Sequence, residues 1–327
     1  MRIYFKRLTQ LIGVVGTIVS IVLFVREPSF PTPDKLLVFI TLVFMAVNQG
    51  WAVFRRLAPF VLLLLTYESF RGLVPKLNTY VNYGFMPAAD RLMFGGQLPT
   101  AVLQHWLWHG HMQWYDFVFY LAYMMHFVFP VVLALVVWKY RAKEYWRYVT
   151  TFVVVSFAGF LTFLAFPAAP PWMASDLGII PHIQRISSMI FFALGLKDFP
   201  SVYNKLSPNP VAAVPSLHAA YATLFALFIT LLFRPSKPKS VSNKAAAPRR
   251  RLSWYSLRWL AWLHPALIWV GTVYQGEHYA IDEIIGIAYA IGAYFAAPYV
   301  LRALVRFSQK GTKWGSTAWQ RAAHLLQ

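Results

Sequence analysis

Apolar runs of membrane-spanning length recur along this chain and are separated by short polar segments. A helix needs about 20 mostly apolar residues to cross about 30 Å of hydrocarbon. The pattern therefore predicts an all-α integral membrane protein with about eight transmembrane helices, at residues 8–25, 36–54, 57–74, 115–138, 147–166, 212–233, 257–275 and 281–305. Arg55 and Arg56 divide a run that is too long for one crossing, so we expect a turn at this pair.

The composition agrees with this pattern. Hydrophobic residues make up 58% of the chain and charged residues only 13%, whereas soluble domains carry about 25% charged residues. The deficit of charge excludes a water-soluble globule of this length. A basic start precedes the first apolar run, and no small-residue cleavage site follows it, so we interpret this run as an uncleaved first helix.

The basic residues predict the orientation. With eight spans, one side of the membrane holds Arg26, Lys35, Arg71, Lys76, Arg91, Arg185, Lys197 and Lys205, and the other side holds the rest of the 30 Lys and Arg residues. Cytoplasmic loops of membrane proteins collect Lys and Arg, so the richer side, which includes both termini, is expected to be cytoplasmic. Topology therefore explains the net charge of +19, and no nucleic-acid partner is expected.

Three polar elements are expected to meet at the outer membrane face. They are Phe166–Trp172, with the sequence FPAAPPW at the end of a span, Val214–His218, which opens another span, and Gly276–Asp282, in the turn between the last two spans. The elements are far apart in sequence, and the topology places them at one depth. A shared site requires this arrangement.

His278 and Asp282 are four residues apart, so on a helix they share one face. The carboxylate can then accept a hydrogen bond from one imidazole nitrogen and leave the other as a nucleophile. A structural ion pair at a helix start is the alternative. Ionisable residues at a membrane face are costly, which favours a function.

His218 follows Ser216 at the opening of a predicted helix. Ser216 is a natural N-cap, and the free backbone N–H groups of a helix start can bind phosphate oxygens. A lone histidine at a helix end is usually only solvated. Together with a second histidine at the same face, His218 becomes a candidate general acid.

These residues resemble a known family. Pro-Ser-x-His at 215–218, followed by His-x-x-x-Asp at 278–282, resembles the type 2 phosphatidic acid phosphatase (PAP2) superfamily. Ala-Pro-Pro-Trp at 169–172 and Pro-Ser-Leu-His-Ala-Ala at 215–220 are similar to the branch that includes fungal inositol phosphorylceramide synthase and many bacterial homologues. The stretch Tyr67–Gly72 (YESFRG) and residues 99–126 are also similar, and the resemblance covers roughly residues 60–295.

The resemblance implies a six-helix catalytic core and a phosphohistidine mechanism. His278 matches the nucleophile that attacks phosphorus, Asp282 its orienting carboxylate, and His218 the acid that protonates the departing alcohol. The implied partners are a phospholipid or lipid phosphate, an alcohol acceptor or water, and the surrounding membrane lipids. No cofactor and no metal are implied.

The chain departs from the superfamily pattern at the phosphate-binding cations. That pattern has an arginine six residues before the nucleophilic histidine, and Thr272 occupies this position here. Arg71 is the main candidate for a replacement, and a salt bridge between Arg71 and Glu68 is the equal alternative. Weaker candidates are Lys76, Arg91, Arg185, Lys197 and Lys205. The other candidate substrate-binding residues are Tyr67, Glu68, Ser216, Trp172 and Glu277.

We therefore expect N-terminal membrane helices at 1–56, a PAP2-like catalytic membrane domain at 57–307 with a cytoplasmic linker at 235–251, and a basic cytoplasmic tail at 308–327. The expected function is a lipid phosphatase or phosphotransferase of a bacterial plasma membrane, with its site facing the extracytoplasmic side. Hydrolysis and transfer of a headgroup such as phosphoinositol to an alcohol both remain open. A proton-coupled transporter and an inactive lipid-binding homologue are the alternatives.

Overall fold

The computed structural model describes residues 2–28, 31–196, 209–233 and 258–311. Within these ranges the regular elements are helices, joined at one end by two isolated β-bridges. The helices are α1 (Arg2–Arg26), α2 (Pro33–Met45), α3 (Gly50–Arg71), α4 (Val74–Leu77), α5 (Phe85–Met93), α6 (Pro99–Leu107), α7 (Trp114–Tyr140), η1 (Ala142–Glu144), α8 (Tyr145–Ala165), α9 (Pro171–Asp176), α10 (Ile186–Ala193), α12 (Leu217–Leu232), α14 (Leu263–Tyr274) and α15 (Ala280–Gly311).

Among the described residues, five apolar helices are long enough to cross a membrane: Lys6–Arg26, Gly50–Leu77, Trp114–Tyr140, Ala142–Ala165 and Ala280–Phe307. This confirms an all-helical fold with membrane-spanning segments. The other three predicted spans appear as the shorter helices α2, α12 and α14, so the count of eight and the cytoplasmic location of the termini stay predictions.

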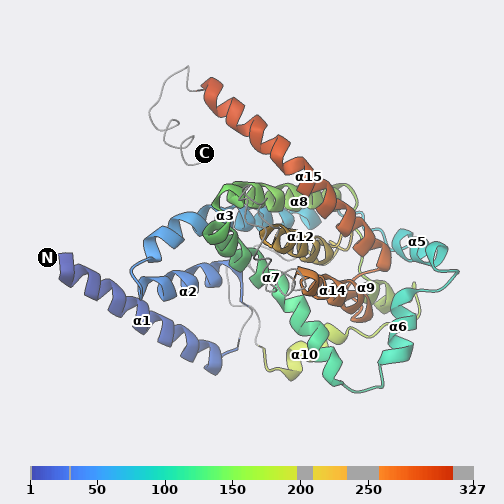
Figure 1. Ribbon diagram of the computed structural model, residues 1–327. Helices are drawn as coiled ribbons and strands as arrows, with labels where there is room; N and C mark the ends of the chain where they lie inside the picture. Colours follow the sequence, from blue (N-terminus) through green and yellow to red (C-terminus); the bar gives the residue numbers. More distant parts are fainter. Residues whose placement is uncertain (1, 29–30, 197–208, 234–257, 312–327) are drawn as a thin grey trace, which may run out of the picture.

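The helices α3, α7, α8, α12, α14 and α15 pack into one bundle, and α1 and α2 lie beside it (Figure 1). Large aromatic side chains fill the bundle core. Tyr148 and Phe152 of α8 contact Phe60 of α3, and Tyr148 also packs edge-on against Phe228 of α12. Edge-on ring contacts of this kind are favourable and hold neighbouring helices together.

The expected turn at Arg55 and Arg56 is wrong. The chain turns earlier, between Met45 and Gly50, and both arginines lie inside α3. The guanidinium of Arg56 is held near two aromatic rings, at 6.0 Å from the centroid of Trp138 and 5.9 Å from that of Tyr145. A cation over aromatic faces is stabilised at the membrane edge, so a basic pair need not interrupt a helix there.

Basic residues gather at one end of the bundle. Tyr145 donates a hydrogen bond to the carbonyl of Arg56, and Arg141 donates to the carbonyl of Leu232. These contacts bring the start of α3, the end of α7 and the end of α12 together. The opposite end holds the C-termini of α3, α8 and α14 and the N-termini of α12 and α15, from which the polar elements project.

Loops at this second end are pinned to one another. Asn82 donates from its backbone to Pro167 and accepts from Ala169, and Ala168 donates to Val211. The short helices α5, α6, α9 and α10 lie at the same end. The predicted linker at 235–251 lies outside the described residues, as do Lys197 and Lys205. Of the predicted tail at 308–327, residues 312–327 also lie outside them.

Candidate active site

His218 and His278 touch each other. Nδ1 of His218 lies 3.1 Å from Nε2 of His278, within hydrogen-bonding distance. His218 is the second residue of α12, and His278 lies in the turn between α14 and α15. The two imidazoles that the sequence places on separate helix ends therefore meet, and a phosphoryl group can enter between them only if the rings separate.

Asp282 stands behind His278, on the first turn of α15. Its Oδ2 lies 3.5 Å from Nδ1 of His278 and accepts a hydrogen bond of 2.9 Å from the backbone N–H of Tyr279. The carboxylate is fully buried. A proton on Nδ1 that faces Asp282 leaves the lone pair of Nε2 directed at His218, which is the tautomer a nucleophilic histidine requires.

Ser216 caps α12 and joins it to α15. Its hydroxyl accepts from the backbone N–H of Ala219 at 3.2 Å, and its own N–H donates to the carbonyl of Asp282 at 3.0 Å. Gly286 allows this close approach, because a Cβ there would lie 2.2 Å from the carbonyl oxygen of Ser216. The helix that carries His218 is thus fixed directly to the helix that carries Asp282.

The turn that carries His278 needs its glycine. Gly276 has φ of 81°, a left-handed conformation that side chains disfavour. Its carbonyl accepts from the backbone N–H of Trp172 at 3.2 Å, and the carbonyl of Thr272 accepts from Glu277 at 3.0 Å and His278 at 3.3 Å. These bonds tie the Ala-Pro-Pro-Trp element to the histidine turn.

Arg185 is the cation beside this turn. Its guanidinium forms two hydrogen bonds with the carboxylate of Glu277, at 2.9 and 3.4 Å, and lies 4.2 Å from the centroid of the Trp172 ring. Ser187 donates a further bond to Glu277. Burial opposes the charged form of Arg185, but the charge and hydrogen bonds of Glu277 outweigh it and raise the pKa of the guanidinium.

Arg71, the main sequence candidate for a cationic clamp, forms a salt bridge with Glu68. The distance from its Nη1 to Oε2 of Glu68 is 2.9 Å. Tyr67 is buried in the core, where its ring packs edge-on against Phe157.

Aromatic rings support His218 from behind. The ring of Tyr123 stacks on it with centroids 4.6 Å apart, and the ring of His126 lies 4.3 Å away. His126 in turn stacks on Tyr221 at 4.7 Å with nearly parallel planes. Tyr123 and Tyr221 could not be assigned a role from sequence, because an aromatic residue in an apolar run looks the same whether it packs in the core or lines a site.

Comparison with known families agrees with this geometry. Two family models, each described as PAP2 superfamily, match residues 93–242 and 183–306. Together they extend over well over half of the chain and include both histidines and Asp282.

The chain belongs to the PAP2 superfamily.

Three relatives place it near one branch of the PAP2 superfamily. The phosphoinositol dihydroceramide synthase of Bacteroides thetaiotaomicron is 28% identical over 180 residues, which cover 53% of this chain and 52% of the relative. The inositol phosphorylceramide synthase catalytic subunit of Schizosaccharomyces pombe is 25% identical over 226 residues, covering 63% and 44%. The inositol phosphorylceramide synthase of Candida albicans is 24% identical over 216 residues, covering 62% and 39%.

The chain spans about half or less of the length of these relatives. No solved structure matches it.

Thr272 replaces the arginine of the PAP2 pattern and has a different partner. Its hydroxyl donates to Oε1 of Glu283 at 2.8 Å, and Glu283 is buried beside Asp282. Thr272 carries no charge, so the phosphate-binding cation has to come from another element. No sequence pattern marks Glu283 as part of the site.

Asp90 of α5 is the second missed residue. It is fully buried, and its carboxylate accepts from the backbone N–H groups of Ala280 at 3.0 Å and Ile281 at 2.9 Å, which open α15. Burial raises its pKa to about 6, against the effect of these two hydrogen bonds. Asp90 thus caps the helix that carries Asp282, and only the fold brings the two segments together.

His278 is more basic than an ordinary histidine. Burial alone lowers its pKa, but the carboxylate of Asp282, 3.5 Å from Nδ1, and the negative charges of Glu283 and Glu277 outweigh burial and raise the pKa. A more basic imidazole is also a better nucleophile once it is deprotonated.

Proposed function

We propose that this chain is a membrane phosphotransferase that moves the phosphate-bearing headgroup of a phospholipid to an alcohol through a phosphohistidine on His278. The observation that carries the proposal is the contact of 3.1 Å between His218 Nδ1 and His278 Nε2, with Asp282 behind. Membership of the PAP2 superfamily supports the same chemistry.

In the first step, Nε2 of His278 attacks phosphorus and an N–P bond forms. The P–O bond to the departing lipid alcohol breaks, and His218 donates its Nδ1 proton to the leaving oxygen. Asp282 accepts the hydrogen bond from Nδ1 of His278 and so stabilises the positive charge that develops on the imidazole.

In the second step, the hydroxyl of an acceptor attacks the phosphohistidine. His218, now neutral, takes the hydroxyl proton, a new P–O bond forms, and the N–P bond to His278 breaks. Water in place of the acceptor gives hydrolysis. The three relatives are named as synthases that join phosphoinositol and a ceramide, which favours transfer over hydrolysis.

Phosphoryl transfer also needs positive charge on the equatorial oxygens. We assign this role to Arg185, because it pairs with Glu277, the residue next to His278. We assign a second contribution to the backbone N–H groups at the start of α12. The site is proposed to open on the extracytoplasmic side, because Arg56 and Arg141 lie at the opposite end of the bundle.

Single-residue variants test the proposal. His278→Ala should abolish transfer from phosphatidylinositol to a lipid alcohol in vesicles. His218→Ala should lower the rate of turnover far more for phospholipids than for substrates with good leaving groups, because only a poor leaving group needs a proton. The exposed His105 supplies a control, and His105→Ala should behave like the wild type.

Two results would contradict the proposal. One is wild-type turnover in purified His278→Ala. The other is no product from the wild-type chain with any phospholipid donor, which would favour the transporter or the inactive homologue.

A further inference from the structure

The two histidines of the site are oriented in different ways. Asp282 lies behind one ring nitrogen of His278, which is the common arrangement for a histidine that takes part in catalysis. Among the residues that the structure describes, the contact of 3.1 Å with Nε2 of His278 is the only hydrogen bond of the His218 side chain. Within this part of the chain, no carboxylate therefore orients His218 through its second nitrogen.

Two rings of α7 contact His218 instead. The ring of Tyr123 stacks on the imidazole with centroids 4.6 Å apart and planes 22° apart, and the ring of His126 lies 4.3 Å away at 41°. Tyr123 and His126 are three residues apart, so both side chains lie on one face of the helix. A ring that lies nearly flat on its neighbour cannot turn about its own side-chain bonds without a clash, so these contacts restrict the direction of Nδ1 of His218.

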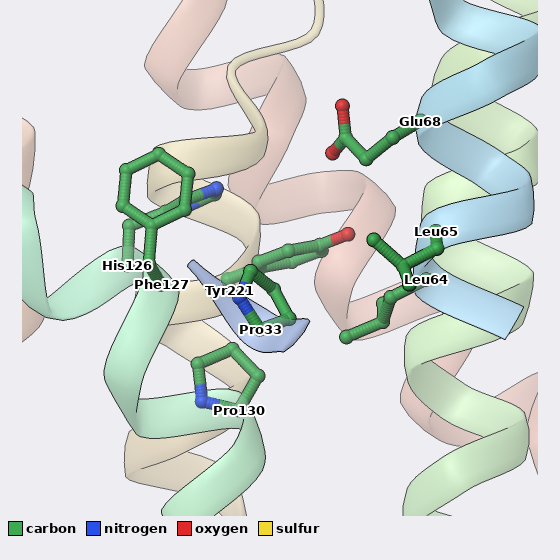
Figure 2. A pocket seen from close by; sticks show the side chains of 8 residues that line it. All are labelled: Pro33, Leu64, Leu65, Glu68, His126, Phe127, Pro130 and Tyr221. Atoms are coloured by element: carbon green, nitrogen blue, oxygen red, sulfur yellow. The ribbon is translucent and has the colours of Figure 1, made fainter. Parts of the chain in front are cut away.

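His126 is itself supported by a ring of α12. It stacks on Tyr221 with centroids 4.7 Å apart and nearly parallel planes, and Figure 2 shows both residues beside a small cavity between α3, α7 and α12. Nδ1 of His126 is buried without a hydrogen-bond partner among the described residues, so ring contacts hold His126 in place. Tyr221 shares a hydrogen bond with Ser156 of α8.

The result is a column of rings that alternates between α7 and α12 and ends against α8. We call it the ring column, and its members are Tyr123, His218, His126 and Tyr221. His218 is the one member of the ring column that also contacts His278.

We propose that Tyr123 and His126 are positioning residues that keep Nδ1 of His218 directed at the oxygen of the departing alcohol. The inference rests on the proposed function, in which His218 protonates this oxygen, and it adds what orients the acid. Proton transfer needs an aligned donor and acceptor, and an imidazole that turns freely spends much of its time in unproductive orientations. The ring column therefore does for His218 what Asp282 does for His278.

Stacking also allows the substrate to enter. A phosphoryl group fits between His218 and His278 only after the two rings separate. Offset stacks of rings are favourable, so the imidazole of His218 can slide across the ring of Tyr123 and stay parallel to it. The acid can thus move away from the nucleophile without losing its orientation.

Two donors that differ only in the leaving group test the role of Tyr123. The full chain in phosphatidylcholine vesicles receives phosphatidylinositol or the para-nitrophenyl ester of inositol phosphate, with ceramide as acceptor. The value of kcat/KM for the donor reports the step in which the alcohol departs. Tyr123→Leu should lower it about tenfold for phosphatidylinositol, the rate equivalent of one lost ring stack, and change it little for the nitrophenyl ester, whose leaving group needs no proton. Tyr123→Phe keeps the ring and should match the wild type with both donors.

Phe129→Leu is the matched control. Phe129 lies on α7, is half-buried like Tyr123, and stacks on Phe225 of α12 with centroids 4.3 Å apart and planes 14° apart. The variant loses a ring pair between the same two helices, and this pair includes neither histidine of the site. It should lose about as much stability as Tyr123→Leu and leave kcat/KM unchanged for both donors.

Variants of His126 separate ring stacking from proton transfer. Phenylalanine keeps a flat ring between His218 and Tyr221 and carries no nitrogen, and the adjacent cavity of about 20 Å³ leaves room for the larger ring. His126→Phe should therefore keep the wild-type ratio of kcat/KM between the two donors, whereas His126→Leu should lower it as Tyr123→Leu does. Equal losses in His126→Phe and His126→Leu would mean that His126 acts through its nitrogen atoms, and the positioning role would be wrong.

A measurement without substrate separates this inference from the proposed function. The proton that Nδ1 of His218 donates to Nε2 of His278 is followed by NMR in protein with isotope-labelled histidine, and its signal is assigned by its absence from His218→Ala. The proton should exchange slowly with water in the wild type, Tyr123→Phe and Phe129→Leu, and about tenfold faster in Tyr123→Leu. This result would support the positioning role even if the wild type released no alcohol from phosphatidylinositol.

Two results would overturn the inference. One is a loss in Tyr123→Leu that is equal for both donors and is repeated in Phe129→Leu. The other is an exchange rate of the His218 proton that is the same in Tyr123→Leu and the wild type. Neither result would affect the phosphohistidine on His278, because failure of that mechanism would appear as turnover by His278→Ala.

Discussion

The bond between Thr272 and Glu283 gives a quantitative prediction, because Thr272 stands where the PAP2 pattern has an arginine. Thr272→Val keeps the shape of the side chain and removes the hydroxyl that donates to Glu283 at 2.8 Å. Glu283 is 3% exposed, and its Oε2 has no hydrogen-bond partner among the described residues. The variant therefore leaves a buried carboxylate with one donor fewer.

The expected loss follows from the charge on the acceptor. A hydrogen bond to an ionised group contributes roughly 1.5–3 kcal/mol. Thr223 supplies the reference, because it is equally buried and its hydroxyl bonds only to the carbonyl of Ala219, four residues back. The hydroxyl of Thr272 also lies 2.7 Å from the carbonyl of Ile268, four residues back, and its single proton is shared between this carbonyl and Glu283. Thr272→Val should therefore destabilise the protein by about 1.5–3 kcal/mol more than Thr223→Val does.

Unfolding by SDS in mixed micelles, followed by tryptophan fluorescence, measures this difference. Activity adds a second readout, because Glu283 adjoins Asp282 on the first turn of α15. We expect kcat to fall while the KM of the donor changes little. Equal stability of the two valine variants would show that the Thr272–Glu283 bond does not hold α14 to α15, and the reasoning would be refuted.

Three further predictions concern the same end of the bundle. Glu277→Gln removes a negative charge that raises the pKa of His278, so the acid limb of the pH–rate profile should move to lower pH; an unchanged limb would exclude His278 as the titrating group. Gly286→Ala should destabilise by about 1–3 kcal/mol in the same unfolding assay, and Gly292→Ala, with open space around it, should not; similar losses would contradict the close packing. A periplasm-dependent reporter fused just after α9 should be active and one within 236–248 inactive; the reverse would invert the topology.

The central pair of the site could be predicted from sequence. His218 and His278 each follow a recognisable motif at the end of an apolar run, and membrane topology restricts such ends to two surfaces. Two histidines at the same membrane surface of one helix bundle lie close to each other. The topology and the two motifs together therefore predict that His218 and His278 meet. Asp282 follows from its helical spacing to His278.

The surroundings of the pair could not be predicted in this way. Asp90 acts through a contact with a segment far along the chain, and no local pattern marks an aspartate as the cap of a helix that begins 190 residues later. The bond between Glu283 and Thr272 joins two neighbouring helices and depends on how α14 and α15 pack. Arg185 was only one of five weaker candidates, because its position beside Glu277 depends on how the loop before α10 folds.

The predicted helix boundaries were wrong where charged residues were assumed to end a helix. Arg55 and Arg56 read as a turn because charged residues are costly within hydrocarbon. Arg56 instead stacks near Trp138 and Tyr145 at the end of the bundle, where a long side chain can reach the interface. The helices α12 and α14 are shorter than the apolar runs that contain them. Apolar residues beyond a helix end can be buried by neighbouring helices, so an apolar run can extend past the helix.

The most direct test of the central claim is a search for the covalent intermediate. Purified protein is mixed with phosphatidylinositol for a short time, quenched in alkali, in which phosphohistidine survives, and the modified peptide is read by mass spectrometry. We predict a phosphoinositol adduct on His278 that is absent from His278→Ala and is removed when the acceptor alcohol is added. An adduct on another residue, or efficient turnover with no adduct at any time, would contradict the phosphohistidine mechanism.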